Sequence, residues 1–165
     1  MKRVAKFHKV SLEQFLKDVK GDFPQYTEAD IKDIYESIEL PKRATKGSAG
    51  YDFYVVDDVI IPAHKHILLP TNTKAYMQSD EVLMLYARSS LAIKRGLVLK
   101  NMTGIIDSDF YPNEIKIALE NTTDEDVTLT KGERVAQGIF MKYLVSDNGN
   151  LDVSRDGGFG STGKK

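Results

Sequence analysis

The sequence predicts an all-β fold, a sandwich or a barrel, preceded by two helices. After Leu40-Pro41 the chain consists of short runs rich in β-branched, aliphatic and aromatic residues, interrupted by Gly, Pro, Asn or Asp. The expected strands are residues 51–56, 58–61, 66–69, 82–87, 97–99, 114–119 and 135–140. No helical period separates these runs, and regularly spaced short strands without helices between them are typical of closed all-β folds.

Before Leu40 the spacing of apolar residues changes to that of helices. Ser11 stands three residues before Gln14, as in a helical capping box, and Thr27 starts a second helical pattern. The apolar stripes are Leu12, Phe15, Leu16 and Val19 in the first pattern and Ile31, Ile34, Tyr35 and Ile38 in the second. We expect one domain over residues 1–165, with a short strand within 2–10, a helical insertion at 11–39, a β core at 40–150 and a flexible arm at 151–165.

Composition narrows the classes of function. The chain has 165 residues, a net charge of −1 and no cysteine. It therefore has no overall basic field for nucleic acid or membrane, and disulfides and thiolate chemistry are excluded. Met1-Lys-Arg is not followed by an apolar signal region, and no apolar run is long enough to span a membrane. We expect a soluble, cytoplasmic protein whose anion sites are local.

The C-terminal motif Arg155-Asp-Gly-Gly-Phe-Gly-Ser-Thr-Gly163 is the most informative stretch. It has four glycines between residues 157 and 163 and ends two residues before the last position, so no helix follows it. Fixing glycine is entropically costly, and we expect this arm to become ordered over a ligand. Arginine and hydroxyl groups suit phosphate oxygens, and a phenylalanine ring suits a nucleobase.

Four further segments place polar residues where strands and turns do not require them. They are Ser48-Ala-Gly-Tyr-Asp52, Arg88-Ser-Ser-Leu-Ala92, Asn101-Met-Thr-Gly-Ile-Ile-Asp107 with the Ser-Asp-Phe-Tyr111 that follows, and Gly132-Glu-Arg-Val-Ala-Gln137. Each alone has a structural explanation, such as a turn residue, a surface ion pair or a solvated loop. Together, in this order and with the arm, they resemble the five motifs of the trimeric dUTPase family over about Leu40 to Lys165.

The resemblance implies a jelly-roll (β-clip) subunit, a homotrimer with active sites shared between subunits, and Mg²⁺-dependent hydrolysis of dUTP to dUMP and pyrophosphate. Asp107 matches the carboxylate that activates the water attacking the α-phosphate. Asp52 matches a carboxylate that contacts the metal through water. The positions that match phosphate-binding residues are Arg88, Ser89, Ser90, Gln137, Arg155, Gly160, Ser161 and Thr162.

The segment from Leu97 to Ile106, expected to form a hairpin, matches the family's uracil-selecting element. Asn101, with main-chain groups as far as Gly104 and Ile106, would pair with the uracil edge, and Phe159 of the arm would stack on the base. The third position after Asp107 is Phe110 where the family usually has tyrosine, so either Phe110 or Tyr111 would pack on the deoxyribose. One extra residue precedes Glu114, and Arg155 lies one residue closer to Phe159 than is common in the family.

Two alternative functions follow from the same residues. dCTP deaminases share the fold and an RSSLA-like run, but the place of the deaminase glutamate is Ala118 here, although Glu120 lies on the same face of the strand. The second alternative is a nucleotide-gated regulatory protein. Residues 11–39 are expected to be packing decoration, and the alternative is that their apolar stripes bind a regulatory protein partner.

Overall fold

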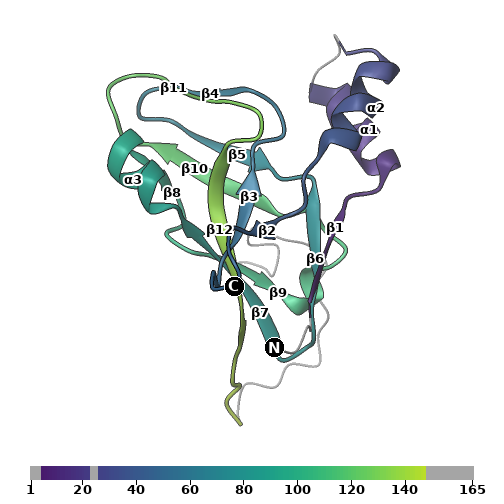
Figure 1. Ribbon diagram of the computed structural model, residues 1–165, viewed down its shortest axis with the longest axis vertical. Helices are drawn as coiled ribbons and strands as arrows, with labels where there is room; N and C mark the ends of the chain where they lie inside the picture. The colour runs from purple at the N-terminus through teal and green to yellow at the C-terminus, as the bar shows by residue number, and fades with distance from the viewer. Residues whose placement is uncertain (1–4, 23–25, 148–165) are drawn as a thin grey trace, which may run out of the picture.

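The computed structural model describes residues 5–22 and 26–147, and the fold in this part of the chain is mainly β (Figure 1). The helices are α1 (Leu12–Asp22), α2 (Glu28–Ser37), α3 (Ser89–Arg95) and the 3₁₀ turn η1 (Ser108–Phe110). The strands are β1 (Lys6–Lys9), β2 (Lys42–Arg43), β3 (Tyr51–Tyr54), β4 (Val59–Ile61), β5 (His66–Pro70), β6 (Thr73–Tyr76), β7 (Glu81–Ala87), β8 (Leu97–Leu99), β9 (Gly104–Asp107), β10 (Lys116–Asn121), β11 (Val127–Leu129) and β12 (Arg134–Lys142).

The strands form antiparallel sheets with many crossovers. The largest has the order β2-β3-β12-β7-β9, and a second has the order β5-β10-β8. The pairs β1-β6 and β11-β4 complete the described part. Strands far apart in sequence therefore lie side by side, as β3 and β12 do, and the arrangement is consistent with a jelly roll.

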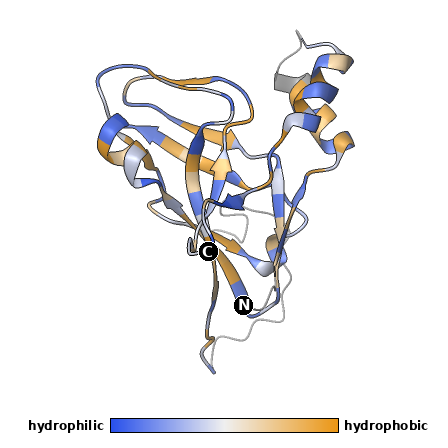
Figure 2. Cartoon of the chain, viewed as in Figure 1, coloured by the Kyte–Doolittle hydropathy of each residue, from blue (hydrophilic) through white to orange (hydrophobic). Residues whose placement is uncertain are grey.

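Alternating burial explains why these segments form strands. In β10 every second residue is buried, and Ile117, Leu119 and Asn121 point inward. Ile117 and Leu119 join one apolar core with Phe53, Leu83 and other residues of the facing strands, and the core strands carry orange stretches of ribbon in Figure 2. Asn121 is fully buried, and its amide donates to the carbonyl oxygens of Ile61 and Glu125.

The two expected helices are present. Thr27 and Asp30 form a complete capping box at the start of α2, and the Ser11 hydroxyl accepts a hydrogen bond from the Gln14 amide at the start of α1. The apolar stripes, however, are not an exposed contact surface. Phe15 and Ile31 are buried, and they form a small second core with Val10 and Ile38. Most of both stripes is therefore used in packing the helices, whereas Leu12 stays 37% exposed, and binding of a partner to this unit stays a prediction.

The sequence prediction also failed at some strands and at one helix. Strands β2, β6, β9 and β11 were not among the expected strands, and α3 contradicts the expectation that no helix interrupts the β region. α3 has seven residues and buries only Leu91, so its sequence does not contain the repeated apolar spacing by which a helix is recognised. It ends at Gly96, whose φ of 62° is left-handed and suits glycine.

The expected hairpin from Leu97 to Ile106 is wrong in its pairing. β8 pairs with β10, whereas β9 pairs with β7, so the two strands belong to different sheets. The chain between them turns through Met102, whose φ is 62° and whose amide donates to the Leu99 carbonyl at 3.0 Å. The segment is a corner between sheets. No helix in residues 5–22 or 26–147 is long and apolar enough to cross a membrane.

Candidate active site

Three of the motifs meet at the C-terminal end of β7. There a pocket of about 370 Å³ opens between β3, β12 and the β7–α3 junction. Its lining includes Ser48, Gly50, Asp52, Arg88, Ser89, Ser90, Arg134 and Gln137. The structure thus brings together five predicted site residues, Asp52, Arg88, Ser89, Ser90 and Gln137, from segments separated by up to 85 positions.

Asp52 lines this pocket between two arginines. Its side chain is only 10% exposed; Oδ1 is 3.3 Å from Arg88 Nε, and Oδ2 is 3.2 Å from Arg134 Nη1. A carboxylate this buried needs such partners, and both guanidinium groups are in turn fixed by it. A guanidinium has five N–H donors, so the contacts with Asp52 leave several N–H groups of Arg88 and Arg134 available to an anion.

Strand register explains the position of Gln137. It is opposite Asp52 on β3 and Tyr86 on β7, so it faces the same pocket as Asp52. Gly50 permits this close packing, since a Cβ atom at residue 50 would lie 2.8 Å from Gln137 Oε1. The glycine of the Ser48–Asp52 motif therefore makes room for the glutamine of the fourth motif.

Asp107 lies near the opposite end of β7. It is the last residue of β9 and pairs with Val82, whereas Arg88 follows Ala87 at the other end. Six residues of extended strand separate Val82 from Arg88, which corresponds to about 20 Å. Asp107 does not line the arginine pocket of its own chain.

A turn closes the Asp107 motif. After Asp107 the chain forms η1, and both the backbone amide and the side-chain amide of Asn113 donate to the carbonyl oxygen of Phe110, at 2.9 and 2.8 Å. The Phe110 ring is buried. Tyr111 is 36% exposed, and its ring lies edge-on to Tyr76, with centroids 5.8 Å apart. Which of the two rings packs on a sugar remains a prediction.

The other residues predicted to bind the base lie on β9 and on the corner before it. Ile106 pairs with Leu83 and Gly104 with Leu85, so these residues run from Asp107 along β7 toward its Ala87 end. Gly104 is buried where a Cβ atom would lie 3.0 Å from Leu85 Cβ, and Ile106 is half-buried against the core. Asn101 is exposed on the corner between β8 and β9. The arm residues Arg155, Phe159, Gly160, Ser161 and Thr162 lie outside the described residues.

One residue of the pocket was missed by sequence reasoning. Arg134 was quoted within the fourth motif but given no role, and the structure places it on Asp52. The signal was present in the motif, but its partner is 82 positions away. Among the described residues, no three His, Asp or Glu side chains gather as a metal-ligand group, and Asp52 is a single carboxylate.

This chain is thus a β protein of the jelly-roll type that gathers polar motifs at the two ends of one strand. The family model for dUTPase matches residues 36–163. The chain belongs to the dUTPase family.

Known dUTPases are similar to this chain over most of their own length. A deoxyuridine 5'-triphosphate nucleotidohydrolase of Lactococcus lactis is 47% identical over 133 residues, which cover 76% of this chain and 89% of the relative. The protein of that name from Paramecium bursaria Chlorella virus 1 is 38% identical, covering 81% and 96%. The crystal structure of dUTPase from Streptococcus mutans superposes with a TM-score of 0.68 at 40% identity, covering 86% of this chain and 98% of that chain.

One structural neighbour also extends over the N-terminal helices. The dUTPase of Staphylococcus bacteriophage 80alpha superposes with a TM-score of 0.68 and covers 99% of this chain, at 20% identity. This likeness shows a shared fold only. The comparisons do not favour the deaminase alternative, and Glu120 Oε1 is 2.5 Å from Lys100 Nζ, in an ion pair.

Proposed function

We propose that this protein hydrolyses dUTP to dUMP and pyrophosphate. The observation that carries the proposal is the pocket in which Asp52, Arg88 and Gln137, from three separate motifs, converge. Its two arginines suit a polyanionic substrate. The relatives from Lactococcus and the Chlorella virus are named for this activity. The biological roles would be to keep uracil out of DNA and to supply dUMP for dTMP synthesis.

In this mechanism Asp107 acts as the general base. Its carboxylate takes a proton from a water molecule that attacks the α-phosphorus, the bond to the bridging oxygen breaks, and pyrophosphate leaves with that oxygen. Arg88 neutralises charge on the phosphate oxygens, Gln137 orients them by hydrogen bonding, and Ser89 and Ser90 contact the leaving group. Arg155, Gly160, Ser161 and Thr162 of the arm close over the β- and γ-phosphates.

The metal fits this site as part of the substrate complex. Mg²⁺ prefers oxygen ligands and keeps several waters, so triphosphate oxygens and waters would hold it and Asp52 would accept a hydrogen bond from one of those waters. The ion would supply charge neutralisation on the phosphates. A dUTPase from phage phi11, which shares the fold, coordinates a structural Mg(II) ion.

Asn101, Gly104 and Ile106 would recognise the uracil edge, and Phe159 would stack on the base after arm closure. Phe110 or Tyr111 would pack on the deoxyribose and exclude a 2′-hydroxyl. If cytosine entered a site closed around uracil, polar groups of the site would be left unpaired. The site would therefore select dUTP over dCTP.

We further propose a homotrimer of single-domain chains, with residues 151–165 as the arm that completes a neighbour's site. The distance of about 20 Å between the two ends of β7 supports this, because catalysis needs both halves around one triphosphate. In the trimer, Asp107 of one subunit would face the arginine pocket of another.

The test is pyrophosphate release from dUTP, dCTP, dTTP and UTP with Mg²⁺, for the wild type and for Asp107→Asn. Asp107→Asn keeps the side-chain shape and removes the base, so we expect a fall of about 10³-fold or more in kcat while dUTP binding persists. Hydrolysis should be confined to dUTP. Ammonia release from dCTP would overturn the proposal in favour of a deaminase, and dUTP binding without turnover would indicate a regulatory protein.

A further inference from the structure

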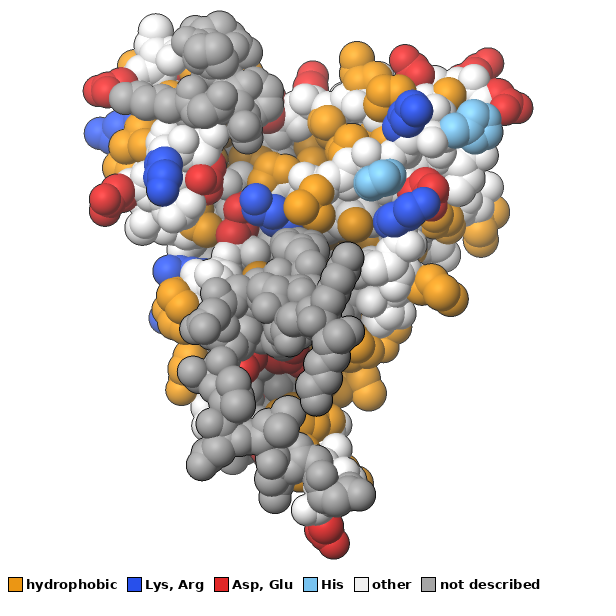
Figure 3. Space-filling view, turned by 180° about the vertical axis from the view of Figure 1, so that it is seen from behind, with side chains coloured by type: hydrophobic (Ala, Val, Ile, Leu, Met, Phe, Trp, Pro, Cys, Tyr) orange, Lys and Arg blue, Asp and Glu red, His pale blue; other side chains and the backbone are white. Residues whose placement is uncertain are grey.

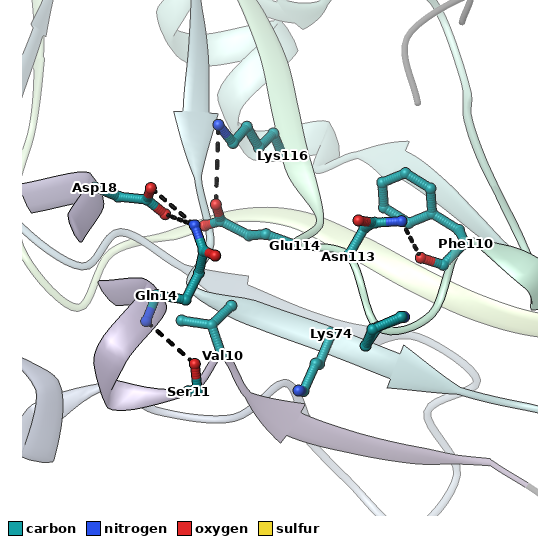
Figure 4. Close-up of a pocket in the computed structure, with 10 residues that line it drawn as sticks. Val10, Ser11, Gln14, Asp18, Lys74, Phe110, Asn113, Glu114 and Lys116 are labelled. Carbon is teal, nitrogen blue, oxygen red and sulfur yellow. Dashed lines mark hydrogen bonds and ion pairs between the residues drawn. The ribbon is translucent and has the colours of Figure 1, made fainter. Parts of the chain in front are cut away.

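Two cavities lie at the junction between the α1–α2 unit and the strands, and they share three charged residues. One, about 450 Å³, is polar and lies behind the turn that follows Asp107 (Figure 4). The other, about 190 Å³, lies between the helices and strands β4 and β5. Asp18, Glu114 and Lys116 line both. Acidic, basic and apolar side chains gather at this junction on the molecular surface (Figure 3).

The smaller cavity has an apolar interior. Its apolar lining residues come from both helices and from the barrel: Phe15, Val19, Ile34, Val56, Val59, Leu68, Leu69 and Pro70. A dry cavity of about 150 Å³ is large enough for benzene. The volume here therefore fits one compact apolar group.

The charges around this apolar interior are unbalanced. Among the residues that the structure describes, its lining has four carboxylates, on Asp18, Asp57, Asp58 and Glu114, and one ammonium, on Lys116, whereas the whole chain has a net charge of −1. Within residues 5–22 and 26–147, the one ion pair of these four carboxylates is Glu114 Oε2 to Lys116 Nζ, at 3.9 Å. The cavity thus favours a cation over an anion or a neutral molecule.

Glu114 stands at the boundary between the two cavities. Its side chain is 10% exposed, and Oε1 accepts a hydrogen bond from the Asn72 amide at 2.7 Å. Burial raises the pKa of the Glu114 carboxyl, and the negative charge of Asp18 acts in the same direction. The carboxylate oxygens of Asp18 accept hydrogen bonds from Gln14 Nε2 (Figure 4). A cation between Asp18 and Glu114 would stabilise both carboxylates.

We propose that this junction is a binding site for a small amphipathic organic cation. Its ammonium group lies between Asp18 and Glu114, and its compact apolar body fills the cavity beside Val19 and Leu69. An inorganic cation is a poorer match, because half of the site would then remain an empty apolar cavity. The smaller cavity, which would hold the ligand's apolar body, is lined by none of the residues proposed to bind dUTP, so the inference does not depend on the proposed hydrolysis.

The first experiment titrates the full-length protein with 2-phenylethylamine and, separately, with 2-phenylethanol, and follows amide chemical shifts by NMR. The amine should bind saturably and shift resonances of Val19, Ile34 and Leu69. The alcohol has nearly the same apolar body without the charge, so its affinity should be at least about tenfold weaker. Equal affinity of the two compounds, or no saturable shifts with the amine, would overturn the proposal.

Variants locate the site. Asp18→Asn and Glu114→Gln should each weaken amine binding about tenfold, and Val19→Phe should block it by filling the cavity. Asp124→Asn is the matched control, since it removes an exposed carboxylate that pairs with His64, away from the two cavities. If Val19→Phe fails to fold, the two charge variants decide the question. Undiminished binding in both, or full displacement of the amine by equimolar Mg²⁺, would reject an organic-cation site.

Discussion

The two ends of β7 are built on different principles. Beyond Ala87, side chains fix one another through charge, because Asp52 holds Arg88 and Arg134 in place. Near Val82, the Asp107 turn is fixed through the backbone, by the β7–β9 ladder and by the two amide donors of Asn113. The first end is prepared to receive an anion, and the second positions a single carboxylate. Their separation of about 20 Å is the basis of the proposal that each chain supplies halves of two different sites.

The strongest test of this difference uses mixed trimers, in which one variant lacks Asp107 and the other lacks Arg88. Asp107→Asn and Arg88→Ala should each be nearly inactive alone, since each removes one half of every site. After unfolding and refolding an equal mixture, we expect about a quarter of wild-type dUTP hydrolysis, because random assembly gives that fraction of sites two intact halves. Mixing without subunit exchange is the control. No recovery in verified mixed trimers would mean that both ends act within one chain.

The sequence predicted the residues at both ends of β7 because strand-terminal polar residues in five ordered motifs are a strong local signal. It did not predict how they connect. Arg134 and Asp52 meet only because β12 pairs with β3. The turn at Met102 is a corner because β8 and β9 belong to different sheets, which local sequence does not indicate. The helices α1 and α2 were predicted from their capping residues and periodicity, yet periodicity could not tell whether their apolar faces meet a partner or each other.

A smaller loss of activity is expected from Arg134, at the charged end of β7. Arg134→Ala removes one of the two cations on Asp52. We expect kcat/KM for dUTP to fall about tenfold, because Asp52 is then held by Arg88 alone and positions Arg88 less firmly. The loss in free energy of unfolding should be modest, about 1 kcal/mol, because the Arg134 side chain is 44% exposed. Arg134→Lys should recover part of the activity. Lys142→Ala, at an exposed Lys142–Asp80 pair, is the control, and equal kinetic effects of Arg134→Ala and Lys142→Ala would contradict this role.

A smaller effect is expected at the backbone-held end. Asn113→Ala removes the side-chain donor to the Phe110 carbonyl but leaves the main-chain donor in place. We expect a loss of about 1 kcal/mol in free energy of unfolding and a fall of a few-fold in kcat/KM, through a looser Asp107–Phe110 turn. Ser37→Ala removes a comparable side-chain bond, to the Ile34 carbonyl in α2, and should change stability without changing kinetics. Identical kinetics for both variants would show that the turn does not depend on Asn113.

The smallest effect concerns pH and Glu114, which lies next to Asn113. Burial raises the pKa of the Glu114 carboxyl above its ordinary 4.5, so the folded protein holds this proton more tightly than the unfolded chain does. The resulting stabilisation is fully present below pH 4.5 and is lost as pH rises through the higher folded-state pKa. The free energy of unfolding of the wild type minus that of Glu114→Gln should therefore fall with increasing pH in this window. Denaturant unfolding of both proteins at several pH values measures it, and a difference that is flat or rises would show that burial of Glu114 is fully compensated by Asn72 and Lys116.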